Sequence, residues 1–223
     1  MTNPHSSENA GTQRARPGRL VVFEGMPRAG KTSMAETLAA AGCCVIGEYL
    51  DAEADGTAAL PVDQHPLVSD DDAHQDNWIR KAAQAKIALG QDITVFSDRD
   101  WLSSLAYAYS LADGADLLAE RASWAKRNLH DGNLLLGDVY VILHLAVPVS
   151  LQRRSTRLRP EHPWSSPAVL DRLATFYRSP AQIIGSIEPA LGELIAQTSV
   201  LHISGLEPPS RNLRLVRRLG RTP

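Results

Sequence analysis

The sequence predicts an α/β fold in which helices cover both faces of a five-stranded parallel sheet, giving three layers. Short apolar runs that stop at glycine or polar residues alternate along the chain with segments rich in helix-forming residues. This alternation is typical of strand-helix-strand units, whose right-handed crossovers build parallel sheets. A chain of 223 residues can bury one core of this kind. We therefore expect one domain over residues 19–223, preceded by a disordered tail at 1–18.

The strands are predicted from continuous apolar and β-branched runs, as expected for strands buried on both faces of a sheet. The first run, 20–24, stops at a glycine, and the following helix, 32–42, is rich in helix formers and also ends on a glycine. The stretch 51–72 is polar and interrupted by prolines, so we expect a long surface loop there. The remaining predicted strands are 43–49, 92–98, 139–148 and 199–205, and the remaining predicted helices are 74–89, 101–112, 115–129, several over 167–197, and a basic amphipathic one at 210–220.

The composition excludes several classes of protein. The formal net charge is −2, which gives no general electrostatic basis for binding nucleic acid or an anionic membrane. No run of eighteen apolar residues predicts a membrane span, and the first residues lack the apolar core of a signal peptide. Cys43 and Cys44 are adjacent and have no spaced partners, so we expect reduced thiols in a cytoplasmic protein.

The segment GMPRAGKT, at residues 25–32, matches the nucleotide-binding pattern G-x-x-x-x-G-K-[ST]. It lies between a predicted buried strand and a predicted helix, as phosphate binding by backbone N–H groups and a helix N-terminus requires. Lys31 would contact the β- and γ-phosphates of ATP, and the Thr32 hydroxyl would ligate Mg²⁺. The predicted nucleotide-binding residues are Gly25, Arg28, Ala29, Gly30, Lys31, Thr32 and Ser33.

Two charged residues follow the predicted strand 92–98, where the carboxyl ends of parallel strands meet the ligand. Asp98 is predicted to hold Mg²⁺ through water, and Arg99 to neutralise charge on the acceptor or on the transferred phosphoryl group. The alternative is a helix-capping Asp98 beside a surface Arg99. The chain has no N-K-x-D motif for reading guanine, and one domain leaves no room for the coupling machinery of a motor or transporter.

A cluster of arginines follows the predicted strand 139–148. Arg153 and Arg157 are four residues apart and share one face of a helix, and four arginines this close repel each other unless an anion lies among them. We interpret the region 153–166 as an arginine-rich lid that closes over the triphosphate and stabilises the transition state. A solvated basic face is the alternative. The cluster consists of Arg153, Arg154, Arg157 and Arg159.

These motifs resemble those of the thymidylate kinase and deoxynucleoside kinase group of P-loop kinases, over roughly residues 19–218. The resemblance implies the P-loop kinase fold, transfer of the γ-phosphoryl group of ATP with Mg²⁺, and a homodimer. SDRDWLSSLAYAY is similar to the thymidylate kinase segment D-R-Y-x-x-S-S-x-A-Y-Q, and LQRRSTRLRPE to the deoxynucleoside kinase lid R-x-x-x-R-x-R-x-E. The matches are Asp98, Arg99, Ser103, Ser104, Ala106 and Tyr107 in the first, and Arg153, Arg157, Arg159 and Glu161 in the second, while Arg28 matches thymidylate kinases with an arginine in the loop.

The departures from the pattern concern the acceptor. Thymidylate kinases end their second strand in R-E-P, whose arginine helps hold the acceptor phosphate, and here Gly47 replaces that arginine before Glu48. Pro27 replaces an acidic residue, and Ala108 a glutamine. In nucleoside kinases a glutamate at this strand end accepts the proton of the attacking hydroxyl, which Glu48 is placed to do. A solvated strand-end acid is the alternative.

We therefore expect a kinase that phosphorylates a hydroxyl of a nucleoside or nucleoside-like acceptor. A nucleoside monophosphate kinase of thymidylate kinase type and a phosphotransferase for an antibiotic or other secondary metabolite are the alternatives. A catalytically silent nucleotide-binding regulator is disfavoured because Lys31, Asp98 and the lid arginines occur together. The predicted catalytic residues are Lys31, Glu48, Asp98, Arg99, Arg153, Arg157 and Arg159, the metal ligands Thr32 and Asp98, and the acceptor-binding residues Glu48, Trp78, Arg80, Gln84, Arg99 and Tyr107.

Overall fold

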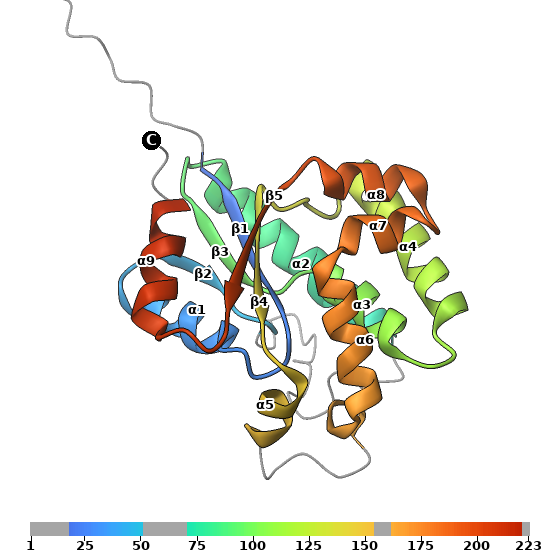
Figure 1. Cartoon of the computed structure of the whole chain (residues 1–223). Coiled ribbons are helices and arrows are strands. Elements are labelled where there is room, and N and C mark those ends of the chain that lie inside the picture. The colour runs from blue at the N-terminus through green and yellow to red at the C-terminus, as the bar shows by residue number, and fades with distance from the viewer. Residues whose placement is uncertain (1–17, 51–70, 154–161, 220–223) are drawn as a thin grey trace, which may run out of the picture.

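The computed structural model describes residues 18–50, 71–153 and 162–219 (Figure 1). All but the last residue of the expected tail at 1–18 lies outside these ranges, as do most of the expected loop and most of the expected lid. The strands are β1 (Leu20–Gly25), β2 (Cys44–Ile46), β3 (Val95–Asp98), β4 (Val139–His144) and β5 (Ser199–Ser204). The α-helices are α1 (Lys31–Ala40), α2 (Asp71–Leu89), α3 (Leu102–Ser110), α4 (Ala115–His130), α5 (Val147–Gln152), α6 (Pro167–Arg178), α7 (Pro180–Gly185), α8 (Pro189–Ala196) and α9 (Pro209–Leu219).

The five strands form one parallel sheet in the order β2-β3-β1-β4-β5, which confirms the predicted fold class. β1 is central, and its six residues are all buried. It pairs with β3 on one side and β4 on the other. Since all strands run the same way, the segments that follow β1, β2 and β3 emerge at one edge of the sheet.

Helices cover both faces of the sheet, as predicted. α1 and α9 lie together on one side, and α3 and α6 pack on the other, with α4, α7 and α8 outside them (Figure 1). Phe23 of β1 and Phe96 of β3 stack with ring centroids 6.1 Å apart inside this core. None of the helices in the described part of the chain has the length and apolar character that crossing a membrane requires.

Several predicted boundaries were wrong. The run 139–148 is not one strand: β4 ends at His144, and α5 begins at Val147, with Pro148 in its first turn. Proline suits that position because it has no N–H to leave unpaired. For the same reason Pro180 and Pro189 each begin one of the several helices that the sequence predicts over 167–197. α2 begins at residue 71, earlier than predicted, and strands β2 and β3 are shorter than predicted.

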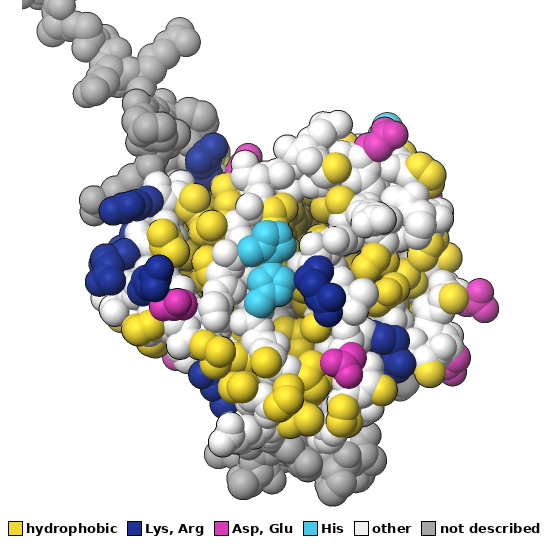
Figure 2. Space-filling view, in the orientation of Figure 1, with side chains coloured by type: hydrophobic (Ala, Val, Ile, Leu, Met, Phe, Trp, Pro, Cys, Tyr) yellow, Lys and Arg dark blue, Asp and Glu magenta, His cyan; other side chains and the backbone are white. Residues whose placement is uncertain are grey.

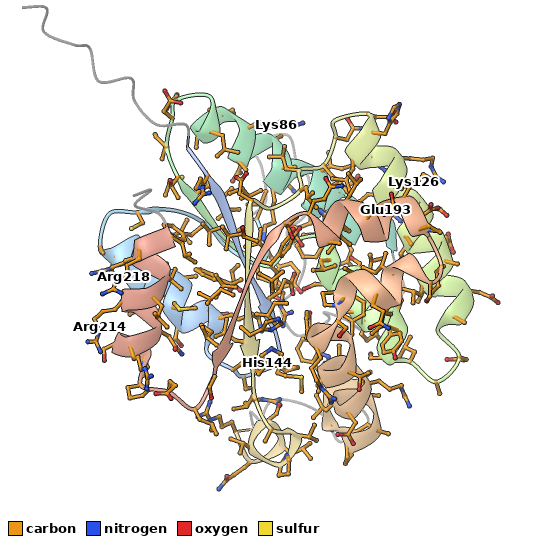
Figure 3. The ribbon with its side chains drawn as sticks, turned by 45° about the horizontal axis from the view of Figure 1, so that its top comes forward. Lys86, Lys126, His144, Glu193, Arg214 and Arg218 are labelled. Carbon is orange, nitrogen blue, oxygen red and sulfur yellow. The ribbon has the colours of Figure 1, made fainter. Side chains whose placement is uncertain are left out.

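β5 is an edge strand and is more exposed than the other four. His144 lies at the carboxyl end of β4 (Figure 3). Its Nε2 is 2.7 Å from Nδ1 of His202 on β5. Two histidine side chains are visible side by side on this face of the molecule (Figure 2). Arg214 and Arg218 of α9 lie on the far side of α9 from the sheet (Figure 3).

Candidate active site

The loop between β1 and α1 has the backbone geometry that its glycines make possible. Gly25 has φ 120°, and a Cβ there would lie 2.2 Å from the carbonyl oxygen of Leu143. Gly30, the residue before α1, has φ 100°. Both values lie in the region that L-residues avoid, so glycine at these positions follows from the shape of the loop. α1 therefore begins at Lys31 with its N-terminus at the loop.

Lys31 is folded back onto its own loop. Its Nζ donates to the carbonyl oxygens of Gly25 at 3.1 Å and Met26 at 2.9 Å. Burial, helped by the positive charge of Arg99, lowers the pKa of Lys31 to about 8, although nearby carboxylates, those of Asp98 and Glu48 most strongly, act in the opposite direction. Lys31 thus lies within electrostatic reach of the charged residues that follow β2 and β3, and a bound phosphate would further favour its charged form.

Thr32 and Asp98 meet across the two strand ends. The Thr32 hydroxyl donates to Asp98 Oδ2 at 2.8 Å, and Asp98 is 1% exposed. Asp98 Oδ1 is buried and, within the described residues, has no hydrogen-bond partner. A buried carboxylate oxygen without a partner is costly unless a ligand satisfies it, and oxygen donors are those that Mg²⁺ prefers. These two residues therefore fit the Mg²⁺ that the sequence predicts.

The helix that precedes the expected lid contacts the phosphate-binding loop. Arg28 Nη1 donates to the Ser150 carbonyl at 3.3 Å, and the Ser150 hydroxyl donates to the Pro27 carbonyl at 3.0 Å. Arg153 Nη1 donates to the carbonyls of Arg28 at 3.3 Å and Gly205 at 3.1 Å. Of the four predicted lid arginines, the structure thus brings Arg153 to the loop. Arg154, Arg157 and Arg159 lie outside the described residues.

Arg99 connects the other predicted residues into one cluster. Its Nε lies 2.7 Å from Glu48 Oε1, and its Nη1 lies 3.5 Å from Glu24 Oε2 and donates to the Ser103 hydroxyl at 3.0 Å. Burial alone would lower the pKa of Arg99, but Glu48, Tyr177 and Glu24 outweigh it, so this pKa lies above its ordinary value. Arg99 is therefore held as a buried cation between two carboxylates, and is not a surface residue.

Glu24, which the sequence analysis missed, is the fully buried centre of this cluster. Its carboxylate accepts hydrogen bonds from the Ser103 hydroxyl at 2.8 and 2.9 Å, the Tyr177 hydroxyl at 2.9 Å and the Asp100 amide at 3.2 Å. A charge buried this deeply requires such partners. The signal available in the sequence was an acidic residue inside the otherwise apolar strand LVVFEG.

A cavity lies between the phosphate-binding loop and the Arg99 cluster. The indole ring of Trp164, which lies within the region expected to form the lid, is 5.8 Å from the Arg99 guanidinium. Trp164 and Tyr177 reach the cavity from distant segments, so sequence spacing gave no indication of either. Tyr107, which the sequence predicts to bind the acceptor, lies in its wall. The lining residues are Gly25, Pro27, Arg99, Ser103, Tyr107, Trp164, Leu173 and Tyr177.

α2 faces the site through residues other than the predicted ones. Trp78 is buried, and its indole N–H donates to the Ser104 hydroxyl at 2.8 Å, while Arg80 is half-buried and Gln84 is exposed. These three side chains are not among those that line the cavity. The side chains of α2 that reach the strand ends are Asn77 and Lys81, which bond to backbone atoms there.

This chain is similar to several known kinases in sequence or in structure. A probable thymidylate kinase from Methanospirillum hungatei JF-1 is 29% identical over 171 residues, covering 71% of this chain and 78% of that protein. The structure of thymidylate kinase from Candida albicans covers 91% of both chains with a TM-score of 0.56 and 14% identity. The structure of deoxyadenosine kinase from M. mycoides with bound dATP covers 91% of this chain and 100% of that one, with a TM-score of 0.57 and 13% identity.

The two structural likenesses confirm the predicted fold, that of the thymidylate and deoxynucleoside kinase group. A family model described as an AAA domain, AAA_28, matches residues 20–178, which include the phosphate-binding loop, the strand ends and the cavity wall up to Tyr177. Because the match extends over more than half of the chain, the protein belongs to the AAA_28 family of AAA domains.

Proposed function

We propose that this protein is an ATP-dependent phosphotransferase that moves the γ-phosphoryl group to a hydroxyl of a nucleoside or nucleoside-like acceptor. The observation that carries the proposal is the position of Arg99, paired with both Glu48 and Glu24 at the end of β3 next to the phosphate-binding loop. The loop would hold ATP, and the acceptor would bind beside Arg99, where the cavity must widen because its volume is only about 10 Å³.

The charges around the cavity favour an acceptor without a phosphate group. Among the lining residues that the structure describes, Arg99 is the charged one, and its guanidinium is already engaged by two carboxylates. A phosphate monoester would need to compete with Glu24 and Glu48 for that cation, and it would approach both carboxylates at short range. A neutral hydroxyl meets no such repulsion.

Glu48 is the residue suited to act as the general base. Its side chain is 22% exposed, so an acceptor can reach it, while Glu24 is enclosed. In the proposed reaction the acceptor oxygen attacks the γ-phosphorus, Glu48 takes the hydroxyl proton, and the bond from the γ-phosphorus to the β–γ bridging oxygen breaks to release ADP. Lys31 would stabilise charge on the β- and γ-phosphates, and Thr32 and Asp98 would hold Mg²⁺, which would supply further charge neutralisation.

A nucleoside monophosphate acceptor is the second candidate, because the archaeal relative is named a probable thymidylate kinase. An antibiotic or other secondary metabolite with a free hydroxyl also fits a neutral acceptor site. We propose a homodimer in the cytoplasm, as the resemblance to these kinases implies, and light scattering after size-exclusion chromatography would test the dimer.

The proposed function is tested by incubating the purified protein with Mg²⁺ and ATP together with nucleosides, nucleoside monophosphates, and amino-sugar and nucleoside antibiotics. Mass spectrometry would then detect a product heavier by one phosphoryl group, alongside ADP. We expect phosphorylation of a neutral hydroxyl compound and none in a Lys31→Ala preparation. Transfer to a monophosphate would support the second candidate, and ADP formation that no acceptor accelerates would contradict both.

A further inference from the structure

Lys81 is a buried lysine on α2 whose ammonium group faces the ends of β2 and β3. It is 4% exposed. Its Nζ donates to the backbone carbonyl oxygens of Asp98 at 2.7 Å and Arg99 at 2.9 Å, and lies 3.4 Å from that of Glu48. An ammonium group has three N–H donors, so these three carbonyls account for all of them. Lys81 therefore connects two strand ends to one helix.

The three carbonyls belong to the residues on which the proposed chemistry depends. Glu48 is the proposed base, Asp98 the proposed metal ligand, and Arg99 the cation that holds Glu48. Their side chains point to the site while their backbone oxygens point to Lys81. Lys81 is thus one buried group that helps to set the relative position of all three side chains, and none of them contacts it through a side-chain atom.

The backbone of Arg99 makes this support necessary. Its φ is 65°, a left-handed conformation that is unfavourable for an arginine and is kept only where surrounding contacts fix it. Its carbonyl accepts from Lys81 Nζ and from the Ser97 hydroxyl at 2.7 Å, and its amide donates to the Phe23 carbonyl at 3.0 Å. This conformation directs the guanidinium toward Glu24 and Glu48.

A second side chain on the same face of α2, that of Asn77, also bonds to the backbone that follows β2. Asn77 lies one turn before Lys81 and is also buried. Its Nδ2 donates to the Glu48 carbonyl at 3.1 Å, and its Oδ1 accepts from the Leu50 amide at 3.1 Å. The ring of Trp78 lies 5.1 Å from Lys81 Nζ and closes the other side of the ammonium group.

We propose that Lys81 is a positioning residue for phosphoryl transfer, which fixes Glu48, Asp98 and Arg99 relative to one another through their backbone carbonyls. The expected effect of Lys81 on turnover rests on the proposed function. Its expected effect on the backbone at Arg99 does not. Lys81 acts without touching the acceptor or the nucleotide phosphates, so its loss changes kcat and leaves the KM for ATP unchanged.

The test compares Lys81→Met with Lys86→Met. Methionine keeps the unbranched stem of lysine and removes its donors. Lys86 lies on the same helix, but it is exposed, and its Nζ donates to the Gly132 carbonyl at the surface (Figure 3). We expect Lys81→Met to lower kcat by about 10²-fold, the effect of a misplacement of about 1 Å at a reacting centre, and Lys86→Met to retain wild-type turnover.

A double-mutant cycle with Glu48→Gln separates positioning from general destabilisation. If Lys81 acts by placing Glu48, Lys81→Met has a much smaller effect on kcat when Glu48 is already replaced, because residues that work as a unit are not additive. An equal loss in both backgrounds would overturn the proposal. So would wild-type turnover in Lys81→Met.

Hydrogen exchange gives a reading that does not depend on activity. The Arg99 amide is bonded to Phe23, and we expect its exchange to become faster in Lys81→Met and to stay unchanged in Lys86→Met. If no acceptor is found for the wild-type protein, the proposed function fails, and unchanged exchange at Arg99 would still refute the role of Lys81.

If Lys81→Met does not fold, Lys81→Ala supplied with ethylamine replaces it. Recovery of turnover and of Arg99 protection with the amine, but not with ethanol, is the expected result, and no recovery would contradict the proposal.

Discussion

Replacing Glu48 by glutamine removes the proposed base while leaving nearly the same shape in the site. The amide keeps a carbonyl oxygen that can accept from Arg99 Nε, which lies 2.7 Å from Glu48 Oε1, but it cannot take a proton from the acceptor. A positioned general base contributes about 10² to 10⁴ in rate. We therefore expect kcat to fall by that factor, equivalent to about 3 to 5 kcal/mol of activation free energy.

The cost to folding is much smaller than the cost to the reaction. The Glu48 side chain is 22% exposed, and Arg99 keeps Glu24 as a partner, so glutamine leaves no buried cation unpaired. We expect a net loss of about 1 kcal/mol in the free energy of unfolding when this partly exposed ion pair becomes a contact between Arg99 and a neutral amide. The variant should stay folded, since domains have about 5 to 15 kcal/mol of stability.

Steady-state kinetics at saturating ATP, with thermal unfolding of the same preparations, measures both effects. Glu193→Gln is a matched control because Glu193 is an exposed acid on α8 (Figure 3). Its turnover should equal that of the wild type. Wild-type kcat in Glu48→Gln would refute the assignment, and a rise in the KM for ATP with unchanged kcat would place Glu48 in nucleotide binding instead.

Three further predictions follow from the same cluster. Lys31→Ala should abolish detectable transfer and leave the circular dichroism spectrum unchanged, and surviving activity would contradict the assignment of the phosphate-binding loop. Asp98→Asn should raise the Mg²⁺ concentration needed for half-maximal turnover by about 10- to 100-fold, as for residues that support a metal site. An unchanged Mg²⁺ concentration for half-maximal turnover would contradict the assignment of Asp98 as a metal ligand. Burial, with the nearby Glu24 charge, raises the pKa of Asp100 to about 8. The folded protein therefore keeps a proton that the unfolded chain loses near pH 4, and this contribution to stability falls between about pH 4 and pH 8, by at most about 1.4 kcal/mol per pH unit. Urea unfolding across that range should show a shallower pH dependence for Asp100→Asn, and parallel curves for the two proteins would contradict this account.

The features that could be read from the sequence are those contained in one strand-loop-helix unit. The glycines and lysine of residues 25–32 and the pair Asp98 and Arg99 are short-range patterns, since the strand before each sets its location. The parallel sheet followed from the alternation of runs along the chain. The predicted boundary failed where a helix with Pro148 in its first turn begins soon after a strand, because an apolar run does not show where its period changes from that of a strand to that of a helix.

The residues on the acceptor side of the site are brought together by contacts between distant segments, which no short sequence pattern contains. Tyr177 donates to Glu24, 153 residues earlier in the chain, and Lys81 bonds to carbonyl groups, which every residue possesses. The sequence by itself determined the fold class and the phosphate-binding loop, because backbone geometry within one unit requires particular residue types. Only the tertiary structure decided how Arg99 is paired and what holds it, because the strand order β2-β3-β1-β4-β5 and the packing of α2 and α6 bring those partners together.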